Sequence, residues 1–395
     1  MDELSQPVDK PPHAGRLAGM SVPLGIPRLR TRDASPEQAA RLVSEELDRR
    51  ADDAPDSGPL RDGFGRSGED LRISLTDKCN LRCTYCMPAD GMQWLPQSSL
   101  LTPEEILRLV TIGVRDLGVR ELRLTGGEPL IRRDLEAIIG LVHDRHPDLP
   151  VSLTTNGIGL ADRARGLAAA GLARINVSLD TIDAETYARL ARRDRLQQVL
   201  DGISAAVDAG LAPVKINAVL MRGINDDQAP DLLEFALAHG LELRFIEQMP
   251  LDGDHGWTRA NMVTAAEVRS ALSSRFVLAP DEEPRGGAPA ERFIVRTRAG
   301  QRRGRVGVIA SVTEPFCAAC TRTRITAAGL VRSCLFSHEE FDLRALMRAG
   351  RTDAQVGRAW RQAMWLKPRA HGMDHVGLDS DDYVQPERSM SEIGG

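Results

Sequence analysis

The sequence predicts an α/β protein whose core is an incomplete (β/α)6 barrel of the TIM type. From Leu71 onward, six short β-like runs alternate with helical patterns, which is typical of βα units around a parallel sheet. Alternate residues in these runs are apolar and polar, which indicates a polar barrel interior. After about residue 250 the alternation weakens and a second group of cysteines follows. We therefore expect a C-terminal cluster-binding region that covers the open side of the barrel.

Composition divides the chain of 395 residues into three regions. Residues 1–65 are rich in Pro, Asp, Arg, Gly and Ser, and only residues 36–50 have a helical pattern. This composition predicts a mobile N-terminal extension. Residues 66–250 form the predicted partial barrel, and residues 251–395 form the predicted C-terminal region with the second cysteine group.

The expected strands come at regular places along the barrel region. They are residues 71–75, 121–125, 151–155, 174–179, 213–220 and 242–247. The helix between the first two strands is the best specified: Thr102 can cap it, and Glu105 completes a capping box. Pro103 suits the first helical position and Gly118 can end the helix. We expect its apolar side to pack against the sheet as a crossover helix.

The alternation within these strands assigns residues to two faces of the sheet. The apolar face, expected to meet the helices, carries Leu71, Ile73, Leu75, Leu122, Leu124, Val151, Leu153, Ile175, Val177, Leu179, Val214 and Ile216. The opposite face carries Arg72, Ser74, Arg123, Ser152, Thr154, Asn176, Ser178, Asp180, Lys215 and Asn217. A complete barrel fills its interior with apolar layers, so this polar face favours an open barrel around a large polar ligand. A sheet with one solvated face is the alternative, although crossover helices normally cover both faces of a parallel sheet.

Charge and hydropathy exclude several classes of protein. The formal net charge is -5 and the sequence pI is about 6.0, so the overall basic character of a nucleic-acid-binding protein is missing. No apolar run reaches the roughly 18 residues of a membrane span, and the N-terminus lacks a signal-peptide pattern. We expect a soluble cytoplasmic protein. Nearly all of its basic residues are arginines, which suit bidentate capture of phosphate.

The first cysteine group follows the first expected strand directly. Cys79, Cys83 and Cys86 stand in CNLRCTYC. Thiolates are the usual ligands of iron-sulfur clusters, and three thiolates leave one iron of a four-iron cluster open for a substrate chelate. A zinc site is the alternative, but no histidine lies nearby in the sequence to complete it.

The second cysteine group allows two interpretations. Cys317 and Cys320 stand in FCAAC, and Cys334 follows in CLF. These three thiolates could hold a second cluster. His338 lies four residues after Cys334, so a zinc site with three cysteines and one histidine also has acceptable spacing.

The order of motifs resembles a known family. CNLRCTYC together with TGGEPL at residues 125–130 is similar to the signature of radical S-adenosylmethionine enzymes, and Gly126 and Gly127 permit close backbone approach to a ligand. With TTNG, INVSLD, VKIN, GIND, RFIEQM, FCAACTRTR and the terminal IGG, the pattern resembles the GTP 3',8-cyclase family from about residue 70 to residue 395. In that family the second triplet binds a second 4Fe-4S cluster whose open iron contacts the purine of GTP. The resemblance therefore favours a cluster over zinc.

The resemblance implies roles for individual residues. Those expected to contact S-adenosylmethionine are Tyr85, Gly127, Ser178 and Met249. Those expected to line the GTP site are Arg72, Arg123, Thr154, Lys215, Arg322, Thr323 and Arg324. Those expected to take part in catalysis are Arg322, Arg324 and the tail glycines Gly394 and Gly395, unless the tail is only a frayed terminus. Residues 367–387 depart from the patterns that can be aligned.

The resemblance also implies the reaction and its partners. One electron from the first cluster would cleave S-adenosylmethionine, and the resulting 5'-deoxyadenosyl radical would abstract the ribose 3' hydrogen of GTP. Attack on purine C8 and a later reduction would give the 3',8-cyclised triphosphate, the first step of molybdenum cofactor biosynthesis. A homodimer, an electron donor and a downstream cyclic pyranopterin monophosphate synthase are implied as well. The alternatives are another twin-cluster radical enzyme, acting on a peptide or a different nucleotide, and a non-catalytic metal-binding scaffold.

Overall fold

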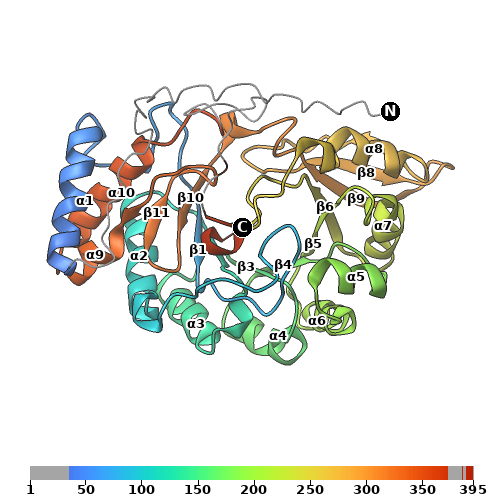
Figure 1. Ribbon diagram of the computed structural model, residues 1–395, viewed down its shortest axis with the longest axis horizontal. Coiled ribbons are helices and arrows are strands. Elements are labelled where there is room, and N and C mark those ends of the chain that lie inside the picture. Colours follow the sequence, from blue (N-terminus) through green and yellow to red (C-terminus); the bar gives the residue numbers. More distant parts are fainter. Residues whose placement is uncertain (1–34, 372–384, 386–387, 395) are drawn as a thin grey trace, which may run out of the picture.

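A single curved sheet organises the protein. The computed structural model describes residues 35–371, 385 and 388–394, and Figure 1 shows the sheet bent into an open ring with helices on its outside. The strand order is β12-β11-β10-β1-β2-β3-β4-β5-β6-β9-β8-β7. The six central strands are β1 (Asp70–Ser74), β2 (Glu121–Thr125), β3 (Val151–Thr155), β4 (Arg174–Ser178), β5 (Val214–Val219) and β6 (Glu242–Ile246). All neighbours among these six are parallel, which confirms the incomplete barrel predicted from the sequence.

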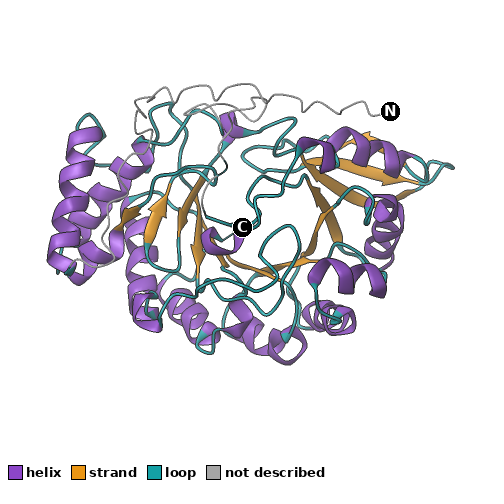
Figure 2. Ribbon diagram, in the orientation of Figure 1, coloured by secondary structure: helices purple, strands orange, loops and turns teal. Residues whose placement is uncertain are grey.

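Helices connect and cover these strands on the outer side, as Figure 2 shows by colour. The helices of the barrel region are α2 (Pro103–Asp116), α3 (Leu135–Arg145), α4 (Leu160–Ala169), α5 (Ala184–Ala191), α6 (Leu196–Asp208) and α7 (Ala229–Ala238). The predicted crossover helix α2 is confirmed in detail. The Thr102 hydroxyl accepts a hydrogen bond from the Glu105 amide, and the Glu105 carboxylate accepts one from the Thr102 amide. None of the helices in the described residues is long and apolar enough to cross a membrane.

Strand alternation separates the two faces as the sequence predicts. The predicted apolar residues, such as Leu71, Ile73 and Leu153, are fully buried in one continuous core with the covering helices. Burial of apolar area stabilises the folded state by about 25 cal/mol per Å². The apolar side of each strand therefore faces the helices, and its polar side faces the inside of the ring. The polar residues are consequently left on the inner side of the ring.

The C-terminal region continues the sheet at both edges instead of forming a separate cover. Strand β10 (Arg322–Ile325) pairs in parallel with β1, and β9 (Arg302–Ile309) pairs in parallel with β6. The outer strands are β7 (Val277–Pro280), β8 (Glu291–Arg296), β11 (Leu330–Arg332) and β12 (Phe341–Asp342). The helices of this region are α8 (Ala265–Ser273), α9 (Leu343–Arg348), α10 (Asp353–Trp365) and α11 (Met390–Ile393). The short 3-10 turns are η1 (Gln97–Ser99), η2 (Pro129–Ile131), η3 (Asp226–Gln228), η4 (Arg259–Asn261) and η5 (Cys317–Ala319).

The N-terminal region differs from the prediction of a mobile extension over residues 1–65. The predicted helix forms as α1 (Pro36–Arg50), and it packs against α9 and α10. Its apolar stripe, which includes Val43 and Leu47, is fully buried, and Leu60 is buried in the same core. The polar composition of this stretch concealed the stripe, because a few apolar residues at helical spacing suffice to dock one helix. Residues 1–34 lie outside the described residues.

This packing predicts that α1 contributes to stability. Leu47 is 0% exposed, so Leu47→Ala should lower the free energy of unfolding by about 2–5 kcal/mol through lost burial and the cavity left behind. Arg41→Ala is the control, because the Arg41 side chain is 70% exposed, and it should change that free energy by less than about 0.5 kcal/mol. Urea unfolding followed by circular dichroism measures both. Equal effects of the two substitutions would contradict the packing of α1.

Candidate active site

All six cysteines line one cavity on the inner side of the sheet. The cavity has a volume of about 330 Å³. Cys79, Cys83 and Cys86 reach it from the loop after β1, while the second triplet reaches it from η5 and from the loop after β11. None of the six forms a disulfide. The fold therefore brings together two groups of thiols that lie far apart in the sequence.

The first triplet sits among neutral hydrogen-bond donors. The Leu81 amide lies 3.4 Å from Cys79 Sγ, and Asn156 Nδ2 lies 3.8 Å from it. Burial raises the pKa of Cys79 and of Cys83, and it raises the pKa of Cys86 to about 12. Thiolates at these positions therefore require a strongly cationic group to bind them. Three free thiols from one loop that line one cavity are the donor set of a four-iron cluster with one open iron.

The second triplet has a more basic environment. Burial raises the pKa of Cys320, but Lys367 and Arg322 outweigh this effect and lower the pKa to about 7. Burial raises the pKa of Cys334, which has no such pair of cations against its sulfur among the described contacts. No group of three or more His, Cys, Asp or Glu side chains in the described part of the chain is arranged to hold a single metal ion. A four-iron cluster instead takes one thiolate at each of several separate corners.

The glycines of TGGEPL press the turn after β2 against the first cysteine loop. A Cβ at Gly126 would lie 2.6 Å from the Thr76 carbonyl oxygen, and a Cβ at Gly127 would lie 2.3 Å from the Lys78 carbonyl oxygen. The Gly127 amide donates to Thr76 O at 2.7 Å, and the Glu128 amide donates to Lys78 O at 2.7 Å. These glycines are therefore needed to seat the cysteine loop, in addition to any approach to a ligand.

Two buried carboxylic acids fix the loops around the first triplet. Glu128 accepts hydrogen bonds from the Leu130 amide, the Thr155 hydroxyl and the Asn156 amide, and burial raises its pKa to about 7. Because Asn156 also approaches Cys79, Glu128 orients a neighbour of the metal-binding loop.

Asp180 plays the corresponding part on the other side of that loop. It accepts from the Tyr85 hydroxyl at 2.7 Å and from the Val219 amide at 2.8 Å, and burial raises its pKa to about 6. Asp180 thereby holds Tyr85 in place. The four residues expected to contact S-adenosylmethionine all line the cavity; they are Tyr85, Gly127, Ser178 and Met249.

A group of arginines gives the cavity a strongly positive wall. Those that line it are Arg72, Arg123, Arg244, Arg322 and Arg324. Burial lowers the pKa of Arg123 to about 9, with repulsion from Arg72 adding to the effect, and burial lowers the pKa of Arg324 well below its ordinary value. These shifts show that the wall is short of compensating anions.

The Asp70 carboxylate opposes part of this wall. Burial raises the pKa of Asp70, but Arg72, Arg123 and Arg322 outweigh it and lower the pKa to about 2. The Nε atoms of Arg72, Arg123 and Arg244 nevertheless lack a hydrogen-bond partner within the described residues. Buried donors without partners cost free energy, and an anionic ligand such as a triphosphate would satisfy them.

Two residues expected in the GTP site are not among those that line the cavity. The Thr323 hydroxyl accepts a hydrogen bond from Trp360 Nε1 at 2.9 Å on the helix-covered face, and Thr323 is 0% exposed. Strand alternation in β10 turns its neighbours Arg322 and Arg324 inward and Thr323 outward. Lys215 donates to Glu242 at 2.9 Å and does not line the cavity. Thr154, by contrast, lines it as expected.

The C-terminal tail enters the same region. Met390 and Ser391 of α11 line the cavity, and Arg324 Nη1 donates to the Gly394 carbonyl at 2.8 Å. Gly394 has φ +73°, and a Cβ there would lie 2.1 Å from Ser74 Oγ. The tail is therefore packed and not frayed up to Gly394. Gly395 lies outside the described residues.

Arg244 is a site residue that the sequence analysis missed. It lies in β6 between the buried Leu243 and Phe245, and it donates to Asn176 Oδ1 at 2.8 Å. Gly307 on the neighbouring strand leaves room for it, because a Cβ there would lie 2.9 Å from Arg244 Cγ. Extending the alternation argument to the sixth strand would have found this residue.

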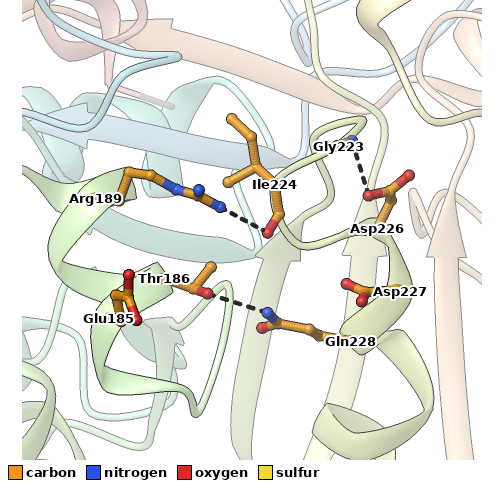
Figure 3. A pocket seen from close by; sticks show the side chains of 8 residues that line it. All are labelled: Glu185, Thr186, Arg189, Gly223, Ile224, Asp226, Asp227 and Gln228. Carbon is orange, nitrogen blue, oxygen red and sulfur yellow. Dashed lines mark hydrogen bonds between the residues drawn. The ribbon is translucent and has the colours of Figure 1, made fainter.

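A second hollow lies near α5 and η3, away from the cysteines. Figure 3 shows Arg189 donating to the Ile224 carbonyl, the Gly223 amide donating to Asp226, and Gln228 donating to Thr186. These contacts tie its walls together. None of the six cysteines lines it.

Comparison with known proteins places the chain in a family. The family model described as the radical SAM superfamily matches residues 73–236, and the model described as Molybdenum Cofactor Synthesis C matches residues 241–373. The GTP 3',8-cyclase of Paenarthrobacter nicotinovorans is 63% identical over 343 residues, covering 85% of this chain and 97% of that protein. The GTP 3',8-cyclases of Mycolicibacterium smegmatis and Streptomyces coelicolor are 54% and 56% identical, covering 87% and 85% of this chain and 94% and 96% of those proteins.

Among solved structures, that of Streptococcus suis SuiB has 20% sequence identity and a TM-score of 0.41, covering 60% of this chain and 50% of that one. The matches to the curated relatives extend over nearly the whole length of those proteins and over most of this chain. The chain belongs to the GTP 3',8-cyclase family of radical S-adenosylmethionine enzymes.

Proposed function

We propose that the cavity is the active site in which GTP is cyclised to its 3',8-cyclo-7,8-dihydro triphosphate. The observation that carries the proposal is that six cysteines and five arginines line one cavity of about 330 Å³. Family membership implies S-adenosylmethionine and 4Fe-4S chemistry, and the C-terminal match fits a second cluster. The residue roles that follow are supported by the contacts of this chain.

The first triplet is proposed to hold the cluster that binds S-adenosylmethionine. When bound, this pair supplies a 5'-deoxyadenosyl radical that removes the ribose 3' hydrogen of GTP. The protein keeps the site ordered: the Gly126–Gly127 turn seats the cysteine loop, and Asp180 fixes Tyr85 at the cavity wall. Ser178 and Met249 are proposed to complete the cofactor contacts.

The second triplet is proposed to hold the cluster that faces the purine of GTP. Arg72, Arg123 and Arg244 are proposed to bind the triphosphate, since their Nε donors have no partner among the described residues. Cations buried at low dielectric stabilise a polyanion more strongly than surface cations do. Thr154 is proposed to add a neutral contact.

Arg322 and Arg324 have separate proposed roles. Arg322 donates to Cys320 Sγ at 3.4 Å and lies over the Phe316 ring, so it ties the second triplet to the arginine wall. Arg324 holds the Gly394 carbonyl, so it fixes the tail against the cavity. Both guanidiniums line the cavity, and they are proposed to stabilise the charge of the cyclised intermediate.

Further partners belong to the proposal. An electron donor is required, because radical cleavage of S-adenosylmethionine consumes one electron. A homodimer, a downstream cyclic pyranopterin monophosphate synthase and a cytoplasmic location are included in the proposal, as the motif resemblance implies them.

Removing one second-triplet ligand should remove one cluster. Anaerobically reconstituted protein should contain about eight irons per chain, and Cys317→Ala should contain about four. The variant should lose cyclised product but keep part of its deoxyadenosine formation, because the first triplet is intact. Iron and sulfide analysis with product assay measures this. A wild type with about four irons and one zinc per chain would instead support the zinc interpretation.

The arginine wall should determine GTP affinity. Arg244→Leu should weaken GTP binding by roughly 10- to 100-fold, because a charged hydrogen bond contributes about 1.5–3 kcal/mol. Thr323→Val is the control: its side chain faces Trp360, so it should lower stability but leave GTP affinity within about twofold. Anaerobic calorimetry with GTP measures both variants. A larger loss in Thr323→Val than in Arg244→Leu would reverse the assignment of the two residues.

The tail should require glycine at position 394. In Gly394→Ala the new methyl would collide with Ser74, so the tail should be displaced and kcat/KM for GTP should fall by about 100-fold or more. Gly300→Ala is matched, because Gly300 also has positive φ (+85°) but has nothing within 4 Å of a Cβ. It should affect stability alone. Unchanged turnover in Gly394→Ala with full iron content would show that the docked tail has no role in catalysis.

A further inference from the structure

Lys367 is a buried cation beside the second cysteine triplet. It is 3% exposed, and its Nζ lies 3.3 Å from Cys320 Sγ and 2.8 Å from the Arg322 carbonyl oxygen. It lies at the start of the segment that departs from the alignable sequence patterns. A lysine is rarely buried without a strong anionic partner, and the nearest candidate here is the Cys320 sulfur.

Two cations converge on this one sulfur. Arg322 Nη1 lies 3.4 Å from Cys320 Sγ, in addition to Lys367. The first triplet differs, because the donors to Cys79 Sγ among the described residues are the Leu81 amide and the Asn156 amide, which are both neutral.

A cation does lie near the first triplet, but it does not bind a sulfur. Arg82 donates to the carbonyl oxygens of Cys79 and Leu81 and stacks on Trp94. The two triplets therefore differ in the charge of the groups that contact their sulfurs, and not simply in the number of nearby basic residues.

The chain holds Lys367 in place from both sides. Its amide donates to the Met364 carbonyl at the end of α10. The guanidinium of Arg66 donates to the Pro368 carbonyl at 2.6 Å and to the Cys317 carbonyl at 2.8 Å. Arg66 is itself paired with the buried Asp62. One anchored guanidinium thus fixes both the second cysteine loop and the residue that follows Lys367, so the ammonium is pre-positioned.

We infer that Lys367 is a positioning residue of the second cluster, which holds the Cys320 thiolate by a charged hydrogen bond and raises the reduction potential of that cluster. The inference rests on the proposed function, because it requires Cys320 to be a cluster ligand. Reduction adds one negative charge to a cluster, and hydrogen bonds to its sulfurs together with net charge nearby set its potential. A buried ammonium on a ligand sulfur stabilises the reduced state more than the neutral donors at Cys79 do.

The difference in donor charge between Cys79 and Cys320 gives the two clusters different reduction potentials, which suits different tasks. Cleavage of S-adenosylmethionine needs a strongly reducing first cluster, and neutral donors around Cys79 leave its potential low. Charged donors at Cys320 set the second cluster at a higher potential and hold this ligand in place at the cavity wall.

The test is an anaerobic redox titration of Lys367→Met and Lys367→Arg, followed by electron paramagnetic resonance with iron counted in each sample. In Lys367→Met the equilibrium constant for reducing the second cluster should fall about tenfold or more, which corresponds to about 59 mV for one electron. The first cluster should be unchanged. Lys367→Arg should retain a reduction potential close to that of the wild type, because arginine keeps both the positive charge and a hydrogen-bond donor.

Lys78→Met is the matched control. Lys78 is exposed and precedes Cys79 in the first cysteine loop. The substitution Lys78→Met therefore removes one lysine charge next to a cluster without removing a donor to Cys320. It should leave the potential of the second cluster unchanged. An equal shift in Lys78→Met would show that overall charge, and not the contact at Cys320, sets the potential.

The outcomes distinguish the inference from the proposed function. About eight irons with an unchanged second-cluster potential in Lys367→Met would overturn the role of Lys367 alone. A wild type with a single cluster signal would overturn the proposed second cluster. If Lys367→Met loses the second cluster, retention of that cluster in Lys367→Arg supports the holding role, and Lys367→Gln, a neutral donor, then tests the potential. An unshifted potential in Lys367→Gln would contradict the contribution of charge.

Discussion

The parallel ladder between β1 and β10 is the interaction on which the site depends. It places Asp70 opposite Arg322 and Arg72 opposite Arg324, so residues from opposite ends of the sequence share one inner face. The cysteine loop after β1 and the second triplet beside β10 are thereby brought to one cavity. A separate C-terminal domain resting on the barrel could shift by a few ångströms. A strand hydrogen-bonded into the same sheet is held in register with its neighbour, so the two cysteine groups keep their relative position.

The ladder also forces like charges together. Arg72, Arg123 and Arg324 lie on neighbouring strands. Burial, with repulsion from Arg72 added to it, lowers the pKa of Arg123 and of Arg324. Such an arrangement destabilises the empty protein and persists only where the surrounding fold is stable enough to hold it. The core on the outer face of the sheet supplies that stability. An anion bound against this wall would gain the interaction energy that the arginines cannot gain from each other.

Much of this arrangement could be predicted from sequence, because it depends on local periodicity. The six strands, α2 with its capping box and the sorting of residues to two faces all follow from spacings of two or about 3.6 residues. The pairing of β10 with β1 could not be predicted that way, since a ladder between distant segments leaves no local signature. The motif predicted Arg322, Thr323 and Arg324 together in the GTP site. In a strand every second side chain points to the opposite face, so the Thr323 side chain contacts Trp360 instead. Arg244 follows the same alternation in β6, which the sequence analysis did not extend to that strand. Lys367 was missed because its role depends on contacts with Cys320 and on the Arg66 clamp, which no local pattern shows.

The position of β1 in the middle of the sheet has a consequence for how the protein is made. β1 is synthesised early, and its partner on one side, β10, emerges from the ribosome only after the whole barrel region. Until then β1 is an exposed edge with unpaired backbone groups and a fully apolar outer face, which is the kind of segment that pairs wrongly with other chains. Contacts of such long sequence separation also form slowly. The first three cysteines follow β1 directly, so along the chain they precede by more than two hundred residues the strand that completes the sheet beside them.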